Sequence, residues 1–308
     1  MKGSSTGRPI LRLFVSTANS ADDSRLEAAL AEIAQQSPGI RTKRQDRLYG
    51  IEGMTEAELD SICDRLRDQY DLAIKVDPPE ALLLETIRWQ AEAEGKYIRQ
   101  VRGSGNYGHC RIRIEPNELG RGYEFINEIN PDTLQPQFAR AIDSGVQTAM
   151  NSGILRGLPI VDVKVTLFDA SYHEADSNET AFNFAGSIAF KDALKRASPV
   201  LLEPVMAFDF DVPDAFTILM EDEINQHHGR IDRMRSENGR SEIRAIVPLS
   251  ELLASTSSVL AAYPMEFAGY EAIRNDNSSN DDESGVTANK PNYPRQGSRS
   301  EAVRPEEE

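Results

Sequence analysis

The chain has almost no cysteine and no recognisable ligand set for a metal. Of its 308 residues only Cys63 and Cys110 are cysteines, and no group of cysteines and histidines has the spacing of a zinc site. Cys63 falls on the apolar stripe of an expected helix, and Cys110 begins an alternating strand. We interpret both as reduced thiols inside the fold, and we expect neither a metal nor a cofactor.

Long apolar runs are also lacking. No segment approaches the roughly 18–20 apolar residues that a membrane-spanning helix needs. The first residues do not have the basic-then-apolar pattern of a secretory signal. We expect a soluble, cytoplasmic protein.

Positive charge is scarce. Lysine and arginine number 34 against 50 aspartates and glutamates, which gives a net charge of −16. This balance argues against a general nucleic-acid coat protein, which needs a basic domain. A local RNA contact remains open, because charges are screened over about 8 Å at physiological salt and a basic tip can act independently of a distant acidic body.

A phosphate-binding loop is absent. No Gly-x-x-x-x-Gly-Lys-Ser/Thr occurs, and at the nearest candidate, Gly95-Lys96, Gln90 stands where the first glycine should be. His173 has no serine or cysteine nucleophile on a convincing elbow beside it, and with Glu174 and Asp176 it lacks a second histidine for a metal. We therefore expect no enzymatic activity.

The order of expected elements indicates an α+β protein of several small domains. The first segment has strands at 9–16, within 40–52 and at 71–76. Its helices begin at Ser20 with Asp23 and at the capping box Thr55 with Glu58. This β-α-β-β-α-β order is that of a ferredoxin-like, split βαβ domain. A second ferredoxin-like segment follows later, with strands at 200–211, 241–247 and 264–270, helices near 213–228 and 249–258, and a turn at Asn238-Gly239.

A different α+β segment lies between the two. We expect strands at 82–91, 95–102, 109–116, 121–129 and 161–167, and helices at 136–151 and 178–197. Proline-rich and Ser-Pro segments mark the expected domain boundaries, which gives domains at 1–78, 79–198 and 199–272. Residues 273–308 are expected to be a disordered acidic tail, because they contain almost no large apolar side chains.

The stretch from Glu94 to His109 combines three features that suit RNA. Gly103, Gly105 and Gly108 allow positive φ and close approach to another backbone. Positive charge comes from Lys96, Arg99 and Arg102, and stacking faces come from Tyr97 and Tyr107. An ordinary glycine-rich hairpin would have the same pattern, so both interpretations stay open.

A second polar stretch, from Phe168 to Glu179, connects a strand to a helix. Ser177 or Asn178 can cap that helix. His173 titrates near neutrality and suits a general base or an RNA contact, but a passive surface loop fits the residues as well. The pair His227-His228 at a helix end is explained by the helix dipole.

Several short phrases follow one another in register: Glu85-Thr-Ile87, Glu94-Gly-Lys-Tyr-Ile-Arg-Gln100, Tyr107-Gly-His109, Pro159-Ile-Val-Asp-Val-Lys164, Ser171-Tyr-His-Glu-Ala-Asp-Ser177 and Val247-Pro-Leu-Ser-Glu251. In this order they resemble the C-terminal half of bacterial elongation factor G, the ribosomal translocase. The resemblance implies that 1–78, 79–198 and 199–272 are similar to domains III, IV and V of that family. Domain IV has the fold of the second domain of ribosomal protein S5. The sequence departs from the family in having neither the GTPase domain nor domain II.

In that family domain IV enters the decoding A site, and a histidine at the position of His173 lies against the tRNA–mRNA duplex. The resemblance implies a ribosome-binding and RNA-binding surface at two tip loops. We expect it to contain Arg99, Arg102, Gly103, Ser104, Gly105, Asn106, Tyr107, His109, Tyr172, His173, Glu174 and Asp176.

We therefore expect an elongation-factor-like protein that binds the ribosome without GTPase activity of its own. Its partners would be ribosomal RNA and the tRNA–mRNA pair at the decoding site, with no membrane. Two alternatives remain: a ribosome-assembly or RNA-folding factor, and a fragment that acts with a separate GTPase subunit.

The purified chain is predicted to bind neither GTP nor ATP, because a phosphate loop and its magnesium-binding hydroxyl are absent. Isothermal titration calorimetry with either nucleotide should give only heats of dilution. Micromolar affinity for GTP would contradict this prediction.

Overall fold

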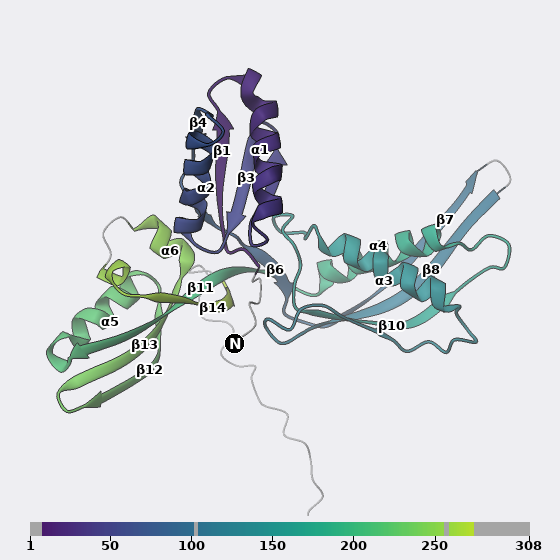
Figure 1. The fold of residues 1–308 in the computed structure, drawn as a ribbon. Helices are drawn as coiled ribbons and strands as arrows, with labels where there is room; N and C mark the ends of the chain where they lie inside the picture. The colour runs from purple at the N-terminus through teal and green to yellow at the C-terminus, as the bar shows by residue number, and fades with distance from the viewer. Residues whose placement is uncertain (1–7, 102–103, 256–258, 274–308) are drawn as a thin grey trace, which may run out of the picture. The chain divides into compact units, whose positions relative to one another are not determined.

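The computed structural model describes residues 8–101, 104–255 and 259–273, and it contains three sheets with helices packed on them (Figure 1). The α+β class expected from the sequence is confirmed. The sheets lie in three lobes: the first lobe (residues 8–78), the middle lobe (79–198) and the third lobe (199–273). The tail expected to be disordered lies outside the described residues, apart from Ile273.

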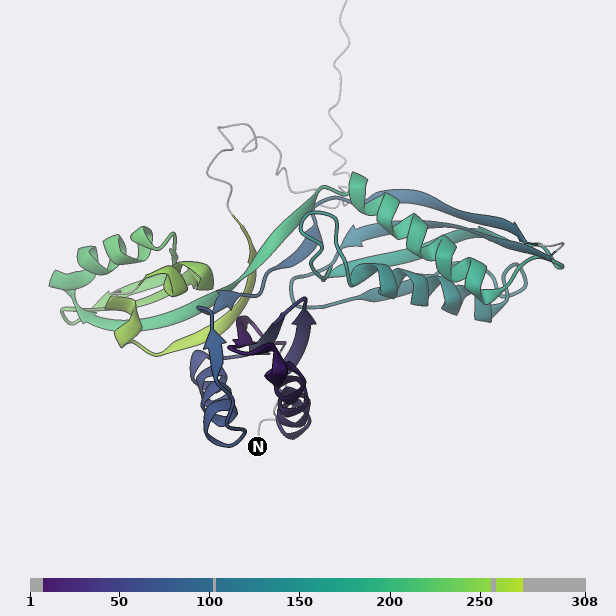
Figure 2. The ribbon, with the colours of Figure 1, turned by 90° about the horizontal axis from the view of Figure 1, so that it is seen from above.

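The first lobe has the ferredoxin-like order. Its sheet runs β2-β3-β1-β4, with the short strand β5 (Glu80–Ala81) beside β1, and both helices lie on one face of the sheet (Figures 1 and 2). The elements are β1 (Leu11–Thr17), α1 (Asp23–Gln36), β2 (Arg41–Gln45), β3 (Leu48–Gly53), α2 (Glu56–Asp68) and β4 (Ile74–Val76).

One of the two helix starts was predicted correctly. The Glu58 amide donates to Thr55 Oγ1 at 3.2 Å, and the Glu58 carboxylate accepts from the Met54 amide at 2.9 Å, which completes a capping box. The start at Ser20 was wrong. A 3₁₀ turn (Ser20–Asp22) precedes α1, and its cap is Asn19, whose side chain accepts from the Ala21 amide.

The middle lobe has a four-stranded sheet in the order β7-β8-β10-β9. Strands β9 and β10 are parallel, and helix α3 connects them. The elements are β6 (Leu84–Ile87), β7 (Ala91–Val101), β8 (Ser104–Pro116), β9 (Glu124–Asn127), α3 (Pro136–Met150), β10 (Val163–Ser171) and α4 (Glu179–Arg196). The expected strand at 82–91 is shorter, because β6 pairs with β11 (Pro199–Pro213) of the third lobe and not with β7.

Helix α4 approaches its neighbours so closely that glycine is required opposite it. A Cβ on Gly95 would lie 1.9 Å from the Ala185 carbonyl oxygen, and one on Gly108 would lie 2.5 Å from that of Ala181. Gly145 of α3 would meet the Asn183 carbonyl oxygen at 2.0 Å. Small residues on both sides therefore set the spacing of α4 from α3 and from the sheet.

Glu85 of β6 is a fully buried carboxylate whose charge is stabilised by backbone amides. Its two oxygens accept hydrogen bonds of 2.9–3.1 Å from the amides of Ile154, Leu155, Arg156 and Leu158. The Glu85 backbone also pairs with the same connection, since its amide donates to Pro159 and its carbonyl accepts from Val161. The loop between α3 and β10 is thus fastened to β6.

Asp162 has a similar role at the other end of that connection. It is buried, has φ of 55°, and accepts from the amides of Gly120 and Gly122 at 3.0 and 2.7 Å. These two bonds hold the loop between β8 and β9, which is why β9 begins at Glu124 and not near residue 121.

The third lobe repeats the ferredoxin-like order with a sheet β12-β13-β11-β14. Its elements after β11 are a 3₁₀ turn (Asp214–Phe216), α5 (Thr217–Gln226), β12 (Arg230–Glu237), β13 (Arg240–Pro248), α6 (Leu249–Ala254), a second 3₁₀ turn (Val259–Ala262) and β14 (Met265–Ala272). The predicted turn is confirmed, since Asn238 and Gly239 have φ of 54° and 77°.

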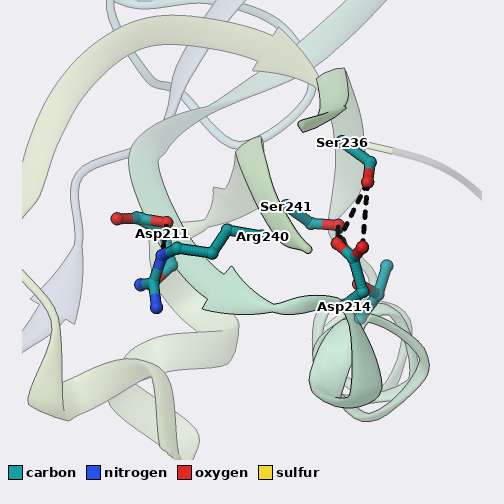
Figure 3. Close-up of polar contacts among 6 residues, drawn as sticks. Asp211, Asp214, Ser236, Arg240 and Ser241 are labelled. Carbon is teal, nitrogen blue, oxygen red and sulfur yellow. Dashed lines mark hydrogen bonds and ion pairs between the residues drawn. The ribbon is translucent and has the colours of Figure 1, made fainter. Parts of the chain in front are cut away.

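The hairpin β12–β13 is tied to the start of α5 through Asp214 (Figure 3). The Asp214 carboxylate accepts from the hydroxyls of Ser236 and Ser241, at 3.0 and 2.7 Å, and its amide donates to the Gly239 carbonyl. Asp211 pairs with Arg240 beside it at 2.8 Å. Helix α5 consequently begins at Thr217, later than the start near residue 213 expected from the sequence.

Both cysteines are buried free thiols. Burial raises the pKa of Cys110 to about 12 and also raises the pKa of Cys63. Each thiol therefore stays protonated at neutral pH, as a structural residue would.

Replacing Gly95 with alanine should destabilise the middle lobe by about 1–3 kcal/mol, because the new methyl group would overlap the α4 backbone. Urea denaturation followed by circular dichroism measures the change. The control is Gly39→Ala, where the nearest atom to the added Cβ is a flexible Glu58 side-chain oxygen at 3.7 Å. Equal stability of the two variants would contradict the close packing of α4.

Candidate nucleic-acid interface

The two polar stretches singled out in the sequence meet at one end of the middle lobe, which we call the tip. The tip comprises the end of the β7–β8 hairpin and the connection between β10 and α4 (Figure 1). Ser171 lies opposite His109 in the β8–β10 register, and Tyr107 bridges to Ser177. The Tyr107 amide donates to the Asp176 carbonyl at 2.8 Å. Chain segments far apart in sequence are therefore hydrogen-bonded here.

A chain of four polar side chains crosses the open face of the sheet at the tip. Tyr107 Oη lies 2.8 Å from Ser171 Oγ, Ser171 Oγ lies 2.9 Å from His109 Nδ1, and His109 Nε2 lies 3.1 Å from Glu94 Oε1. A carboxylate only accepts, so His109 Nε2–H donates to Glu94; in the tautomer that carries its one proton on Nε2, Nδ1 accepts from the Ser171 hydroxyl. The Ser171 oxygen then accepts from the Tyr107 hydroxyl. Each of the four side chains thus has a hydrogen-bond partner, and the donors all point the same way, from Tyr107 towards Glu94.

This set contains a hydroxyl, an imidazole and a carboxylate, as a catalytic triad does. Ser171, however, lies at the end of strand β10 and not on a sharp strand-to-helix elbow. Its oxygen is also engaged on both sides, by Tyr107 and by His109. We interpret the set as a brace between three strands.

His173 is exposed, and its backbone is held firmly. Its amide donates to Ser177 Oγ at 2.9 Å, and its carbonyl accepts from the Ser177 amide at 3.0 Å. Its ring packs edge-on against Tyr107 with 4.3 Å between centroids. Within the described residues its ring nitrogens have no hydrogen-bond partner, so both can bond to an external molecule while the main chain beneath them stays fixed.

Ser177 and Asn178 fix the second stretch to the first. Ser177 Oγ donates to the Tyr107 carbonyl at 3.0 Å. Asn178 caps α4 by accepting from the Ala181 amide at 2.9 Å, and its side-chain amide donates to Asn106 at 2.7 Å. Of the two caps considered from the sequence, Asn178 is the one used.

The glycines of the first stretch act differently from the prediction. Gly105 and Gly108 lie in β8 and do not have positive φ, so that part of the expectation was wrong. The expected close approach to another backbone is confirmed for Gly108, whose Cβ would lie 2.5 Å from the Ala181 carbonyl oxygen of α4. A Cβ on Gly105 would instead lie 2.3 Å from the side-chain carboxylate of Asp176. Gly103 and Arg102 lie outside the described residues.

The remaining predicted residues are spread around the tip. Arg99 is exposed on β7, Ser104 begins β8, and Glu174 and Asp176 are exposed on the second stretch. Tyr172 packs against Phe138 of α3 with 6.3 Å between centroids. The described tip therefore has mixed charge, in which Lys96 and Arg99 lie among Glu94, Glu174, Asp176 and Glu179.

Sequence reasoning did not assign site roles to Glu94, Ser171, Ser177 and Asn178. The structure makes them the groups that hold Tyr107, His109 and His173 in place. A weak signal existed for Asn178, which has a helix-capping side chain at the start of an apolar helical pattern. The others depend on strand register.

No group of three histidine, cysteine, aspartate or glutamate residues that could hold a metal occurs in the part of the chain that the structure describes. Likewise, none of the described helices is long and apolar enough to cross a membrane.

Comparisons with known proteins match most of the chain. Residues 79–198 match the family model for elongation factor G, domain IV, and residues 200–280 match that for the elongation factor G C-terminus. Neither model is that of a GTPase domain. Among solved structures, the protein ttk003000868 from Thermus thermophilus is similar with 30% identity and a TM-score of 0.66, over 87% of this chain and 41% of that one. The chain thus spans less than half the length of that protein.

Replacing Ser177 with alanine should loosen the second stretch, because it removes the hydroxyl that joins the His173 amide to the Tyr107 carbonyl. Amide hydrogen exchange at His173 should become about five- to tenfold faster, since a lost hydrogen bond is worth about 1 kcal/mol. In Ser144→Ala, on the exposed face of α3, this rate should not change. Unaltered protection in both variants would show that the tip is not braced in this way.

Proposed function

Since this chain belongs to the elongation factor G family, with that family's domain IV and C-terminus, we propose that it binds the ribosome and places its tip in the decoding A site. The tip would contact ribosomal RNA and the tRNA–mRNA pair there, as the resemblance of its two stretches to the family's tip loops suggests. Such a role would be carried out in the cytoplasm.

The observation that carries the proposal is the way the tip presents His173. An RNA contact made by a loop side chain costs less when the main chain is already ordered. Here the His173 backbone is held by Ser177, and the ring rests on Tyr107, at 4.3 Å between centroids. Imidazole and phenol rings are surfaces on which bases stack, at about 1–3 kcal/mol per base. The exposed Arg99, opposite Asn106 near the end of the β7–β8 hairpin, would supply a phosphate contact at the same tip.

The proposal divides the chain as the sequence suggested. Residues 1–78 would act as a domain III-like unit, residues 79–198 as a domain IV-like unit with the S5-like fold, and residues 199–272 as a domain V-like unit. GTP hydrolysis, where a cycle requires it, would come from a GTPase outside this sequence. Without it, the chain would hold one ribosomal state and would not drive translocation.

The proposal predicts that ribosome binding depends on the tip. His173→Ala should weaken binding to 70S ribosomes about tenfold without lowering the melting temperature, because an exposed loop residue buries little. Arg99→Ala should weaken binding and reduce the log–log salt slope by about one, as expected for one lost phosphate contact. Pelleting with purified ribosomes across a potassium chloride series measures both.

The matched control is Arg67→Ala, which removes an exposed arginine that is paired with Asp64 on α2 of the first lobe. It should bind ribosomes like the unaltered protein at every salt concentration. If the tip variants also do so, the tip is not the contact surface. Pelleting with precursor subunits and not with 70S particles would favour the alternative of an assembly factor.

A further inference from the structure

The first lobe has an uncovered sheet face with positive charge. The register places Arg12 opposite Glu52 and Phe14 opposite Gly50, and it places Arg41 and Lys43 of β2 opposite the same two residues of β3. Directly opposed residues share a face, so these side chains lie together. The other face carries Leu13, Val15, Tyr49 and Ile51, which are buried under α1 and α2.

Four basic side chains on or beside this face are exposed and have no ion pair within the described residues. They are Arg41 and Lys43 of β2, Arg47 in the β2–β3 turn and Lys75 of β4, which lies opposite Ser16. We call these four residues, with Phe14, the basic face. The carboxylates nearest to it are Asp46 in the same turn, Asp77 after β4, and Glu52 and Glu80. The last two both pair with Arg12, at 2.9 and 3.5 Å.

The helical side of the same lobe is organised differently. Arg25 pairs with Asp22 at 2.8 Å, Arg44 with Glu27 at 2.9 Å and Arg67 with Asp64 at 3.0 Å. These three arginines near the helices therefore have carboxylate partners, and Arg65 of α2 donates to the Gln36 side chain at 2.7 Å, whereas the described residues offer the basic face no such partner. In a chain with a net charge of −16, such a concentration of unpaired positive charge favours an anionic partner.

An aromatic ring lies in the middle of the basic face. Phe14 is half-buried on the central strand β1, and its cross-strand partner Gly50 has no side chain. A Cβ at Gly50 would touch both Phe14, at 3.4 Å, and the Arg12 stem, at 3.3 Å, so the glycine provides the room that these two side chains occupy. The Arg12 guanidinium lies 5.6 Å from the ring centroid.

We infer that the basic face is a second RNA-binding surface, which contacts a single-stranded segment through phosphates at Arg41, Lys43 and Lys75 and through a base stacked on Phe14. An open sheet with an aromatic residue on a central strand and basic residues at its edge provides both interactions that unpaired RNA needs. Edge lysines and arginines also protect a sheet from aggregation, but that role does not require the central aromatic ring. The inference rests on the proposed function only in taking ribosomal RNA as the natural source of the strand.

The test uses the full chain and a fluorescein-labelled mixed-sequence RNA of about 12 nucleotides, within the site sizes typical of single-strand binders, with anisotropy read across a potassium chloride series. The double variant R41Q/K43Q should bind at least about tenfold more weakly and reduce the log–log salt slope by about 1.4, since each phosphate contact on single strands contributes about 0.7. Phe14→Leu keeps an apolar side chain and should weaken binding several-fold with the slope unchanged. The control R25Q/R67Q removes the same charge from the helical side and should leave both quantities unchanged.

Three results would overturn the inference: no binding of the RNA by the unaltered chain, equal affinity and slope in R41Q/K43Q, or preferential binding to phosphatidylserine vesicles. A loss that occurs with Arg99→Ala and not with R41Q/K43Q would assign RNA binding to the tip alone. Ribosome pelleting separates this inference from the proposed function. RNA binding through the basic face without ribosome binding would contradict the proposed function and support the inference. Ribosome binding without RNA binding through the basic face would support the proposed function and contradict the inference.

Discussion

The carboxylate of Glu85 is the interaction on which the arrangement of the middle lobe depends. A buried negative charge is costly unless it is fully hydrogen-bonded, and here four backbone amides from residues 154–158 supply the bonds. The same loop leads from α3 into β10. Its fixed position sets where β10 begins and the register on β8 as far as Leu167. A bulge between Leu167 and Asp169 then shifts the pairing by one residue, which brings Ser171 opposite His109. The geometry of the tip is thus determined in part at the other end of the strand.

Patterns of local chemistry predicted most of the fold. Apolar periodicity located α1, α2, α3 and α4, the Thr55–Glu58 capping box gave the start of α2, and Asn238-Gly239 gave a hairpin turn. Features that depend on interactions between distant segments of the chain were not predicted. Strand β6 pairs across to β11, Asp162 shortens β9, and Asp214 delays α5. All of these partners are far apart along the chain, so no local window contains the information.

The candidate site shows the same division. The chemistry of the residues singled out both stretches and His173, the resemblance to elongation factor G implied a role for them, and the structure brings the two stretches together. The brace of Glu94, His109, Ser171 and Tyr107 needs the registers of three strands, which periodicity alone does not give. The role of Gly108 was misinterpreted for a related reason. In the sequence it suggests a flexible loop, but in the fold a glycine is required because a Cβ at this position would lie 2.5 Å from the Ala181 carbonyl oxygen of α4. The basic face was missed because whether an arginine has a partner is a property of the folded chain.

Strand β11 has a mechanical consequence. It leaves α4 at Pro199, pairs first with β6 and then runs on between β13 and β14 of the third lobe. A force that draws the middle lobe along the axis of this strand is parallel to its neighbours. The hydrogen bonds to β13 and β14 are then loaded in shear and resist together, whereas a sideways force would peel them apart one after another. The attachment is therefore stiff along one direction and weak across it.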